Sequence, residues 1–341
     1  MAGPTFGRNA RLPRPPRRAR AWLVAAVLAA APAAALSVFR AVPVAWPRPV
    51  VQALSFTPWL VLPAAVGVAC ASLSRRAWLF ATTTALLALQ LFWLFPPGFA
   101  RPAQATGTRR VELKVMNINA KHGEADAAEI VRLVRDNGIE LLAVEEYTPA
   151  LEDRLADEGL AGLLPNRISR PDARASGAAV YSLHPMTLTG AVPDTQFLMP
   201  TVGLNLDSGS QSVSLEVTIV HAKPPVDAGV AQWRQDLAAL GKVAARPGNV
   251  VLIGDFNATY DHAEFRQLLA GAGGRQTVDV GVAAGSRLIP TWPMDGLPLP
   301  GIVIDHIVTN PEITGGAYAV HRVPGSDHAA VVATLGIPVE R

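Results

Sequence analysis

Residues 250–258 read Val-Val-Leu-Ile-Gly-Asp-Phe-Asn-Ala, so four aliphatic residues are followed by Asp255 and Asn257. Four aliphatic residues flanked by glycines are too few for a helix and predict a strand buried on both faces. Side chains that follow such a strand leave the packed core and can reach a cleft. The alternation of a strand would turn Asp255 and Asn257 to one side and Phe256 back into the core. An isolated Asp-x-Asn is more often an ordinary turn, so this interpretation depends on the other motifs.

Polar residues stand at the ends of several other predicted strands. Residues 111–116 alternate between apolar and polar side chains, and residues 139–144 form a second buried run, with a helical pattern at 126–137 between them. Together they predict a βαβ-like unit. The polar residues at or beside predicted strand ends are Asn119, Glu146, His221, Asp255, Asn257, Asp305, Asp327 and His328. Because burying an unpartnered polar group is costly, their recurrence favours one shared cleft over eight unrelated positions.

Charge and hydropathy divide the chain near residue 100. The first 100 of the 341 residues hold ten Arg and no Lys, Asp or Glu, whereas the rest hold 20 basic and 27 acidic residues, a formal charge of −7. Three stretches without an internal charge, 21–39, 50–73 and 77–95, each approach the roughly 20 apolar residues that a helix needs to cross a bilayer. We therefore expect a transmembrane segment of three helices over 21–95. A cleaved signal peptide would account for the first stretch and not for the next two.

The placement of arginine predicts the orientation of this segment. Six Arg precede the first stretch and Arg75-Arg76 separate the last two, so the positive-inside rule places both of these regions in the cytoplasm. Arg40 and Arg48 in the first connection are a weaker, contrary signal. Three crossings then place the remainder of the chain on the far side. The expectation is a multi-pass protein of the cell membrane, with a cytoplasmic N-terminus at 1–20 and an extracytoplasmic domain.

A linker and a single domain are expected after the membrane segment. Residues 96–110 are rich in Pro, Gly, Ala and Thr, as linkers are. From residue 111 to residue 341, strand and helix patterns alternate without an internal repeat. We therefore expect one α/β domain over 111–341.

The ordered motifs of this domain resemble those of the endonuclease/exonuclease/phosphatase superfamily, from about Glu112 to about Leu335. The motifs are Val115-Met116-Asn117-Ile118-Asn119, Leu142-Ala143-Val144-Glu145-Glu146, residues 177–185, Val220-His221, Gly254-Asp255-Phe256-Asn257, Ile304-Asp305-His306 and Ser326-Asp327-His328. The resemblance implies a DNase I-like four-layer α/β sandwich, with two mixed sheets face to face and helices outside. It also implies hydrolysis of phosphate esters with Mg²⁺ or a similar ion, Mn²⁺ or Ca²⁺.

The same resemblance implies a role for each polar residue. Glu146 would be the main metal ligand, with Asn119 and Asp327 helping directly or through water. A hard cation prefers such oxygen donors. The implied roles of the others are listed here: Asp255 orients or deprotonates the attacking water, Asn257 holds the phosphate, His328 donates to the phosphoryl oxygens, Asp305 fixes the His328 tautomer and raises its pKa, and His221 contacts the phosphate or helps the leaving group.

Some assignments stay open at the level of the sequence. The family usually has Gln before the metal-binding glutamate, where this chain has Glu145. Asn117 competes with Asn119 for the active-site asparagine because both lie on one face of a strand. Trp292 either flanks the cleft or fills the core. The arginines of the expected loop at 167–174, Arg167, Arg170 and Arg174, would line one side of the cleft.

The substrate class is the least constrained inference. Binding to duplex nucleic acid relies on Lys and Arg at the phosphates, and a domain charge of −7 without a long basic run disfavours a tight, non-specific nuclease. Membrane attachment fits a lipid headgroup, and the remaining options are nucleic acid or a small phosphodiester. A phosphodiesterase is therefore expected, with no obligate protein partner. The alternatives are a tethered extracellular nuclease and a membrane-anchored binding module of the same fold without catalysis.

Overall fold

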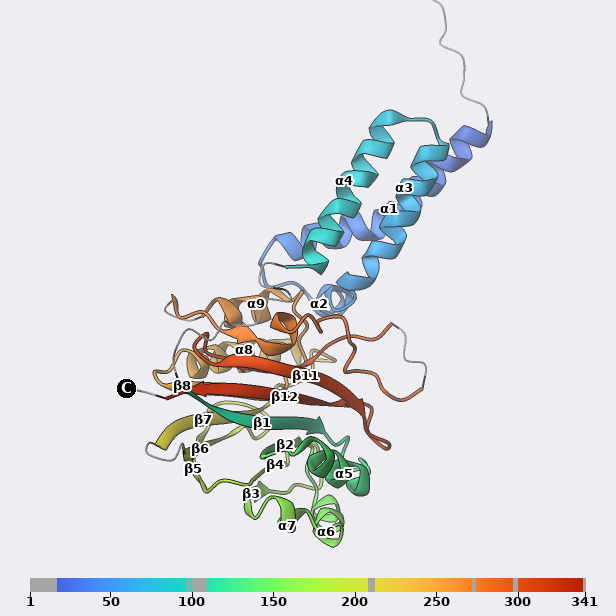
Figure 1. Cartoon of the computed structure of the whole chain (residues 1–341). Coiled ribbons are helices and arrows are strands. Elements are labelled where there is room, and N and C mark those ends of the chain that lie inside the picture. The colour runs from blue at the N-terminus through green and yellow to red at the C-terminus, as the bar shows by residue number, and fades with distance from the viewer. Residues whose placement is uncertain are drawn as a thin grey trace, which may run out of the picture. The chain divides into compact units, whose positions relative to one another are not determined.

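The computed structural model describes residues 17–96, 99, 109–207, 212–271, 274–296 and 300–339, and the chain forms two compact units (Figure 1). The helical unit holds the described residues up to Val38 together with Thr57–Leu94. The sandwich unit holds Phe39–Phe56 and the described residues from Phe95 onward. Most of the expected cytoplasmic N-terminus, 1–20, and most of the expected linker, 96–110, lie outside the described residues.

The apolar helices of the N-terminal part are α1 (Arg17–Ala41), α3 (Val61–Leu73) and α4 (Ala77–Leu94). Among the described residues, α1 and α4 are each long and apolar enough to cross a membrane. The expected continuous helix over 50–73 is wrong. That stretch is divided into α2 (Arg48–Leu54) and a second piece, Thr57–Leu73, which starts with the 3-10 turn η1 (Thr57–Leu60), and the two pieces are bent by 68°. Two helices are therefore candidate spans by length and composition, or three spans are possible if the bent pair counts as one.

One sheet of the sandwich unit has six strands in the order β11-β12-β1-β2-β4-β3. β1 and β2 are parallel, and the neighbouring pairs are antiparallel. The strands of this sheet are β1 (Arg110–Asn119), β2 (Leu141–Glu145), β3 (Asn166–Arg170), β4 (Ala178–Ser182), β11 (Thr314–Arg322) and β12 (Ala329–Pro338).

The second sheet also has six strands, in the order β5-β6-β7-β8-β10-β9. Here β7 and β8 are the parallel pair, flanked by antiparallel pairs. The strands of this sheet are β5 (Met186–Ala191), β6 (Pro200–Asp207), β7 (Ser212–His221), β8 (Asn249–Asp255), β9 (Val278–Asp279) and β10 (Asp305–Thr309). Every residue of β8 is buried, as its aliphatic run predicted.

Helices cover the outer face of each sheet (Figure 1). Side chains of α5 (Ala127–Asn137), α6 (Pro149–Asp157) and α7 (Leu160–Leu163) form one core with the outer face of the first sheet. Side chains of α8 (Val230–Ala244) and α9 (Ala263–Ala270) form another with the second sheet, and the short α10 (Val280–Ala283) follows β9. A third core fills the space between the sheets. The expected α/β architecture of two mixed sheets with helices outside is therefore present.

Local sequence signals explain where these elements begin and end. Asp126 caps α5 by accepting a hydrogen bond from the backbone N–H of Glu129 at 3.0 Å. Gly138, with a φ of 62°, ends the same helix in the left-handed conformation that glycine tolerates best. The strands alternate in the same predictable way: Val251 and Ile253 of β8 enter the core between the sheets, and the residues between them enter the outer core.

Residues 39–56, which join α1 to α3 in sequence, are an integral part of the sandwich unit. Val51 is 1% exposed and packs in the outer core with α8 and α9. His262 Nε2 lies 2.9 Å from the carbonyl oxygen of Val51, and Arg40 Nε lies 2.7 Å from Asp261 Oδ1. This packing explains why the apolar run at 50–73 is not one helix: its first turns are held by the sandwich unit.

We expect Val51→Ala to lower the free energy of unfolding of the sandwich unit by about 2 kcal/mol, because it leaves a cavity among buried side chains. Val44→Ala is the matched control in the same segment, since Val44 is 49% exposed and its truncation should cost less than about 0.5 kcal/mol. The measurement is pulse proteolysis of the full chain in detergent micelles at increasing urea. Equal midpoints for the two variants would show that the segment does not stabilise this unit.

Candidate functional site

The candidate site lies between the two sheets, at the end where both parallel strand pairs finish. β1 and β2 end at Asn119 and Glu145, which are neighbours in register, and β7 and β8 end at His221 and Asp255, which are also neighbours. On β8 the side chain two positions before Asp255, Ile253, belongs to the core between the sheets, so Asp255 faces the same space. The carboxyl ends of parallel strands are a common place for ligand sites in α/β sheets.

Asp305 reaches this end of the sandwich differently from the sequence expectation. Asp305 was expected at or beside the end of a predicted strand, but β10 begins at Asp305 and runs antiparallel to β8. The register pairs Asp305 with Asp255. The start of one strand and the end of the other therefore lie at the same edge of the sheet, and the two carboxylates are brought together there.

Asp255 is the most highly connected of the polar side chains. Its Oδ2 accepts hydrogen bonds from Asn119 Nδ2 at 3.2 Å and from Asn257 Nδ2 at 2.9 Å, and its Oδ1 accepts one from the Asn257 backbone N–H at 2.7 Å. Asn257 does not continue the strand as expected, because its φ is 48° and the chain turns there. Burial raises the pKa of the Asp255 carboxyl to about 7, although the charge of His328 acts in the opposite direction.

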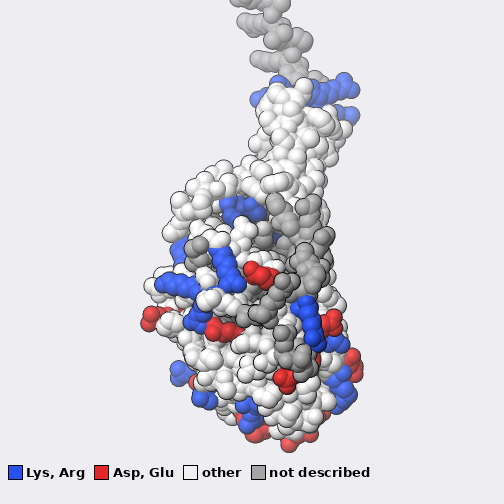
Figure 2. Space-filling view, turned by 60° about the vertical axis from the view of Figure 1, so that its left-hand side comes forward, with Lys and Arg blue, Asp and Glu red and all other residues white. Residues whose placement is uncertain are grey.

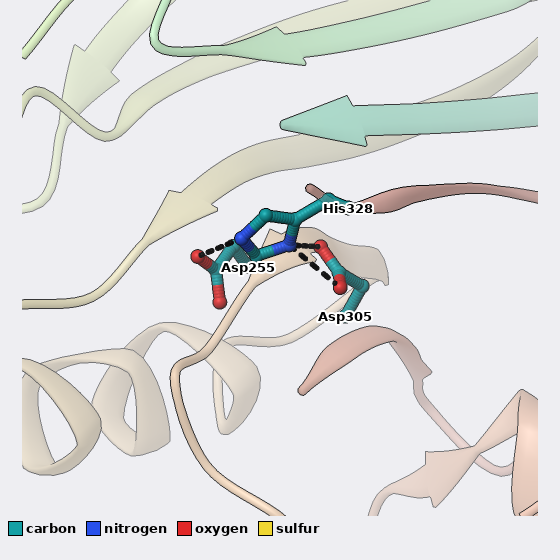
Figure 3. A group of neighbouring side chains, drawn as sticks. All are labelled: Asp255, Asp305 and His328. Carbon is teal, nitrogen blue, oxygen red and sulfur yellow. Dashed lines mark hydrogen bonds and ion pairs between the residues drawn. The ribbon is translucent and has the colours of Figure 1, made fainter. Parts of the chain in front are cut away.

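His328 lies between two carboxylates (Figure 3). Its Nδ1 is 3.0 Å from Asp305 Oδ2, and its Nε2 is 3.9 Å from Asp255 Oδ2. Burial alone would lower the pKa of His328, but the charges of Asp305 and Asp255 prevail and raise it to about 10. The imidazole is therefore positively charged at neutral pH and has one N–H directed toward Asp255.

Backbone and hydroxyl contacts hold His328 and Asp305, the His328–Asp305 dyad, in place. The N–H groups of Ile304 and Asp305 donate to Thr291 Oγ1 at 3.1 and 3.2 Å. The N–H of His328 donates to Ser326 Oγ at 2.9 Å, and that hydroxyl donates to the carbonyl of Asn119 at 2.7 Å. Thr291 and Ser326 thus link residues that are far apart in the sequence.

Glu146 is the glutamate that faces the cleft. It follows β2 with a φ of 53°, and its side chain is 14% exposed. Its Oε2 accepts a hydrogen bond from the His122 backbone N–H at 2.7 Å, and Asn119 Nδ2 lies 3.4 Å from its Oε1. Asn119 therefore bridges the carboxylates of Glu146 and Asp255.

Glu145 and Asn117 form a separate pair inside the core between the sheets. Both side chains are fully buried, and the Asn117 amide nitrogen, in the orientation that satisfies its neighbours, donates to Glu145 Oε1 at 2.7 Å. Burial, together with the charges of Asp305 and Asp255, raises the pKa of Glu145 well above its ordinary value. Burial thus favours the neutral form of Glu145, and Asn119 is the asparagine that contacts Asp255 and Glu146.

His221 borders the same space as a neutral imidazole. Its Nε2 is 3.7 Å from Glu146 Oε1 and 4.0 Å from Asp255 Oδ2. Burial and the charge of His328 lower its pKa to about 3. The ring of Phe197 stacks on it with centroids 4.4 Å apart and an interplanar angle of 20°, and Lys223 Nζ lies 5.0 Å from the centroid of Phe197.

Asp327 is held by another residue of the cleft region. Its Oδ2 accepts a hydrogen bond from Trp292 Nε1 at 3.1 Å. Trp292 is half-buried, and its indole N–H is directed at a predicted site residue. Among the described residues, the group of Asp, Glu, His or Cys whose ligand atoms all lie within 4.8 Å of one another consists of Asp255, Asp305 and His328, without Asp327 or Glu146. His328 Nδ1 is engaged with Asp305, so this group is better explained as a charged dyad beside Asp255.

The oxygen donors that remain fit a hard divalent cation. Glu146 Oε1 and Asp255 Oδ2 both lie near the Asn119 amide nitrogen, and the lowered pKa of His221 leaves no positive charge on that ring beside them. Carboxylate and amide oxygens are the donors that Mg²⁺ and Ca²⁺ prefer. The carboxylates of Glu146 and Asp255 therefore suit a hard divalent cation, with Asn119 beside them.

Sequence reasoning missed some residues of this region and misplaced others. His122 belongs to none of the sequence motifs, but its Nδ1 lies 3.3 Å from Glu146 Oε2. The expected Arg loop is also wrong: Arg167 and Arg170 lie on β3, where Arg167 pairs with Glu152 at 2.6 Å. His122 reaches Glu146 because the chain turns after β1, where Lys121 and His122 have a positive φ next to Gly123. Such a turn is not evident from residue types alone.

Comparisons with known proteins agree with the fold. A model of the Endonuclease/Exonuclease/phosphatase family matches residues 116–328. TDP2 of D. rerio in complex with single-strand DNA product is similar at a TM-score of 0.51, with 14% identity over 66% of this chain and 98% of that chain. An endonuclease/exonuclease/phosphatase from Beutenbergia cavernae is similar at a TM-score of 0.50, with 19% identity over 67% of this chain and 72% of that chain. No curated protein sequence matches the chain significantly.

We expect nitrogen NMR shifts to show His328 charged at pH 8 and His221 neutral, because their pKa values lie near 10 and 3. Replacing Asp305 with Asn removes the charge that favours the imidazolium, so the pKa of His328 should fall by more than about one pH unit. The measurement uses the full chain in micelles with labelled histidine, and His184→Gln serves as an assignment control. A pKa near 6.5 for His328 in the unsubstituted chain would contradict the dyad.

Proposed function

Because the chain belongs to the Endonuclease/Exonuclease/phosphatase family, we propose that it is a divalent-metal-dependent phosphodiesterase anchored in a membrane. The observation that carries this proposal is the convergence of Glu146, Asn119, Asp255 and the His328–Asp305 dyad at one end of the sandwich unit. These are a set of oxygen donors, a carboxylate that can accept a proton and a charged imidazole. Metal-assisted hydrolysis of a phosphate ester can use each of them.

In this proposal Asp255 takes the proton of the attacking water. Its raised pKa makes it a better proton acceptor than an ordinary aspartate, while it is still largely ionised above pH 7. Asn257 holds Asp255 in place, because its amide nitrogen donates both to Asp255 Oδ2 and to the Ala222 carbonyl. The phosphate-holding role implied by the family resemblance is therefore not assigned to that nitrogen.

His328 and His221 act on the phosphoryl group in different charge states. The imidazolium of His328 donates its Nε2 hydrogen toward the phosphoryl oxygens, where negative charge grows during the reaction, and Asp305 keeps the ring charged and oriented. His221 is neutral and lies beside Glu146, where its Nε2 can contact the phosphate or the leaving group.

The divalent cation would be held by Glu146 and Asn119. When bound, it polarises a phosphoryl oxygen and lowers the pKa of a coordinated water. Asp327, which accepts the Trp292 hydrogen bond, is assigned a contact through water. Mg²⁺ is proposed as the natural ion, and Mn²⁺ or Ca²⁺ suits the same oxygen donors.

The proposed topology has three spans and an extracytoplasmic sandwich unit. Residues 39–56 and the strands belong to one unit, so they lie on the same side of the membrane. Thr57–Leu73 comprises a 4-residue turn and a 13-residue helix, which together reach the lower limit of about 17 residues for a crossing. In this topology Thr57–Leu73 crosses toward the cytoplasm, and α4 crosses back to the extracytoplasmic side. α1 crosses once, which leaves the Arg-rich N-terminus in the cytoplasm.

A tethered nuclease is the second candidate function. The D. rerio TDP2 structure contains a DNA product, and the fold is shared. Figure 2 shows basic and acidic groups close together on the sandwich unit, without a broad surface of one sign on the face drawn. This mixture, with the −7 charge of the chain after residue 100, favours a substrate with fewer phosphates than duplex DNA.

We expect the full chain in micelles to hydrolyse bis-p-nitrophenyl phosphate with Mg²⁺ and to lose this activity in EDTA. Asp255→Asn and His328→Gln should each lower kcat by about 10²–10⁴-fold, as removal of a general base or of a charge-stabilising donor does. Asp136→Asn on α5 and His184→Gln, both away from the site, are the matched controls. Folded protein without metal-dependent turnover would instead support the non-catalytic binding module.

The proposed topology predicts a labelling pattern for single cysteines placed in a Cys70→Ala background. In cells, a membrane-impermeant thiol reagent should label Val44→Cys and Asp157→Cys, because both positions are exposed on the sandwich unit. Arg76→Cys, between the last two spans, should be labelled only after permeabilisation. Labelling of positions 44 and 157 from opposite sides would contradict this topology.

A further inference from the structure

Residues 39–56 contact a loop that begins at a proposed catalytic residue. The loop 222–229 follows His221 at the end of β7. Gln52 Nε2 donates to the Pro225 carbonyl at 3.2 Å, and Arg48 Nη1 donates to the Asp227 carbonyl at 3.1 Å. The loop is thus fixed at one end by the site and in its middle by the segment that joins α1 to α3.

A second loop makes the same connection from the other side of the site. In the loop 286–294, Arg287 Nη2 lies 2.9 and 2.8 Å from the two carboxylate oxygens of Asp261, the residue that also binds Arg40 Nε at 2.7 Å. Four residues further on, Thr291 accepts hydrogen bonds from β10 at Asp305, and Trp292 follows it. This loop therefore also runs from the end of α1 to the site.

Both loops expose apolar side chains next to these contacts. Leu288 and Ile289, which directly follow Arg287, are 41% and 47% exposed, and Val226, between Pro225 and Asp227, is 44% exposed. The segment itself exposes Val42 and Val44, and with α8 and α9 it borders a hollow of about 440 Å³ lined in part by Leu237 and Leu268. Exposed aliphatic residues on both loops and on residues 39–56 thus accompany the contacts that join them.

We propose that Val226, Leu288 and Ile289 rest in the lipid leaflet from which α1 and α3 emerge, and that the substrate is a phospholipid headgroup in that leaflet. The inference rests on the proposed function and narrows it to one substrate class. Lipid is the expected occupant of this surface because residues 39–56 join two apolar helices. The same segment bonds to the first loop through Gln52 and is linked to the second through Asp261, which Arg40 and Arg287 share. A loop anchored in the lipid interface would keep the phosphate esters of the lipids within reach of His221 and Asp305.

The reaction is a simple hydrolysis. Water adds across one of the two P–O ester bonds of the headgroup phosphodiester, its oxygen bonds to phosphorus, and its proton passes to Asp255. The bond to one alcohol breaks, and that alcohol leaves with a proton. The products are one alcohol and one phosphomonoester, and no oxidant or second substrate is needed.

The test uses the full chain reconstituted with Mg²⁺ into vesicles of phosphatidylglycerol and phosphatidylcholine. Release of any headgroup product is compared with turnover of bis-p-nitrophenyl phosphate by the same vesicles, and with cleavage of added single-stranded DNA. The variant is Leu288→Ser with Ile289→Ser. The matched control is Leu183→Ser with Leu188→Ser, since these leucines are 48% and 46% exposed and Ser182 pairs with Leu141, at the end of β2 away from the site.

The expected result is that the loop variant loses at least about fivefold in headgroup release, because two apolar side chains leave the lipid interface, while turnover of the soluble diester changes by less than about twofold. The control variant keeps both activities. Equal headgroup release by the loop variant and its control overturns the inference, and so does cleavage of the soluble diester or DNA without any headgroup release. In that case the proposed phosphodiesterase stands, whereas absence of turnover of the soluble diester, the DNA and the lipid refutes the proposed function and this inference together.

Discussion

Negative charge buried between the two sheets is the constraint on which the arrangement of the site depends. Asp255, Asp305 and Glu145 are buried within the same few strand ends, and three neighbouring carboxylates could not all be ionised there. The structure resolves this in two ways. His328 supplies a positive charge between Asp255 and Asp305, and Glu145, whose pKa burial raises well above its ordinary value, has the Asn117 amide as its partner. The chemistry proposed for the site is a consequence of this balance, since the same interactions leave one carboxylate basic and one imidazole charged.

The topology explains why residues so distant in sequence reach one place. Each sheet has a single parallel pair, and the carboxyl ends of both pairs lie at the same end of the sandwich unit. The antiparallel β10 and β12 then bring the starts of their strands to that end, with Asp305 beginning β10 and His328 preceding β12. Asp305 and His328 thus come from strand starts, whereas Asn119, His221 and Asp255 come from strand ends.

Much of the fold could be predicted from the sequence because its signals are local. The buried run of β8, the capped helix α5 and the ordered motifs needed only residue types and spacing. Asp305 could not be placed at the start of a strand from the sequence, because the three aliphatic residues before it, 302–304, have the pattern of a strand themselves. Only the pairing with β8 shows that the strand begins at Asp305. The apolar run at 50–73 has the composition of one helix, but burial of Val51 in the sandwich unit divides it. Likewise, Asn117 and Asn119 share a strand face, and only their partners separate them, because Asn117 bonds to Glu145 and Asn119 bonds to Asp255.

The central claim is that Glu146 and Asn119 hold a divalent cation beside Asp255, the proposed proton acceptor. The most direct measurement is the dependence of bis-p-nitrophenyl phosphate hydrolysis on Mg²⁺ concentration for the full chain and for Glu146→Gln. We expect saturable activation of the unsubstituted chain, and an activation constant at least about tenfold higher in Glu146→Gln, as loss of a metal ligand or its supporting partner produces. The same activation constant in both proteins would contradict the account, because the cation would then be bound elsewhere.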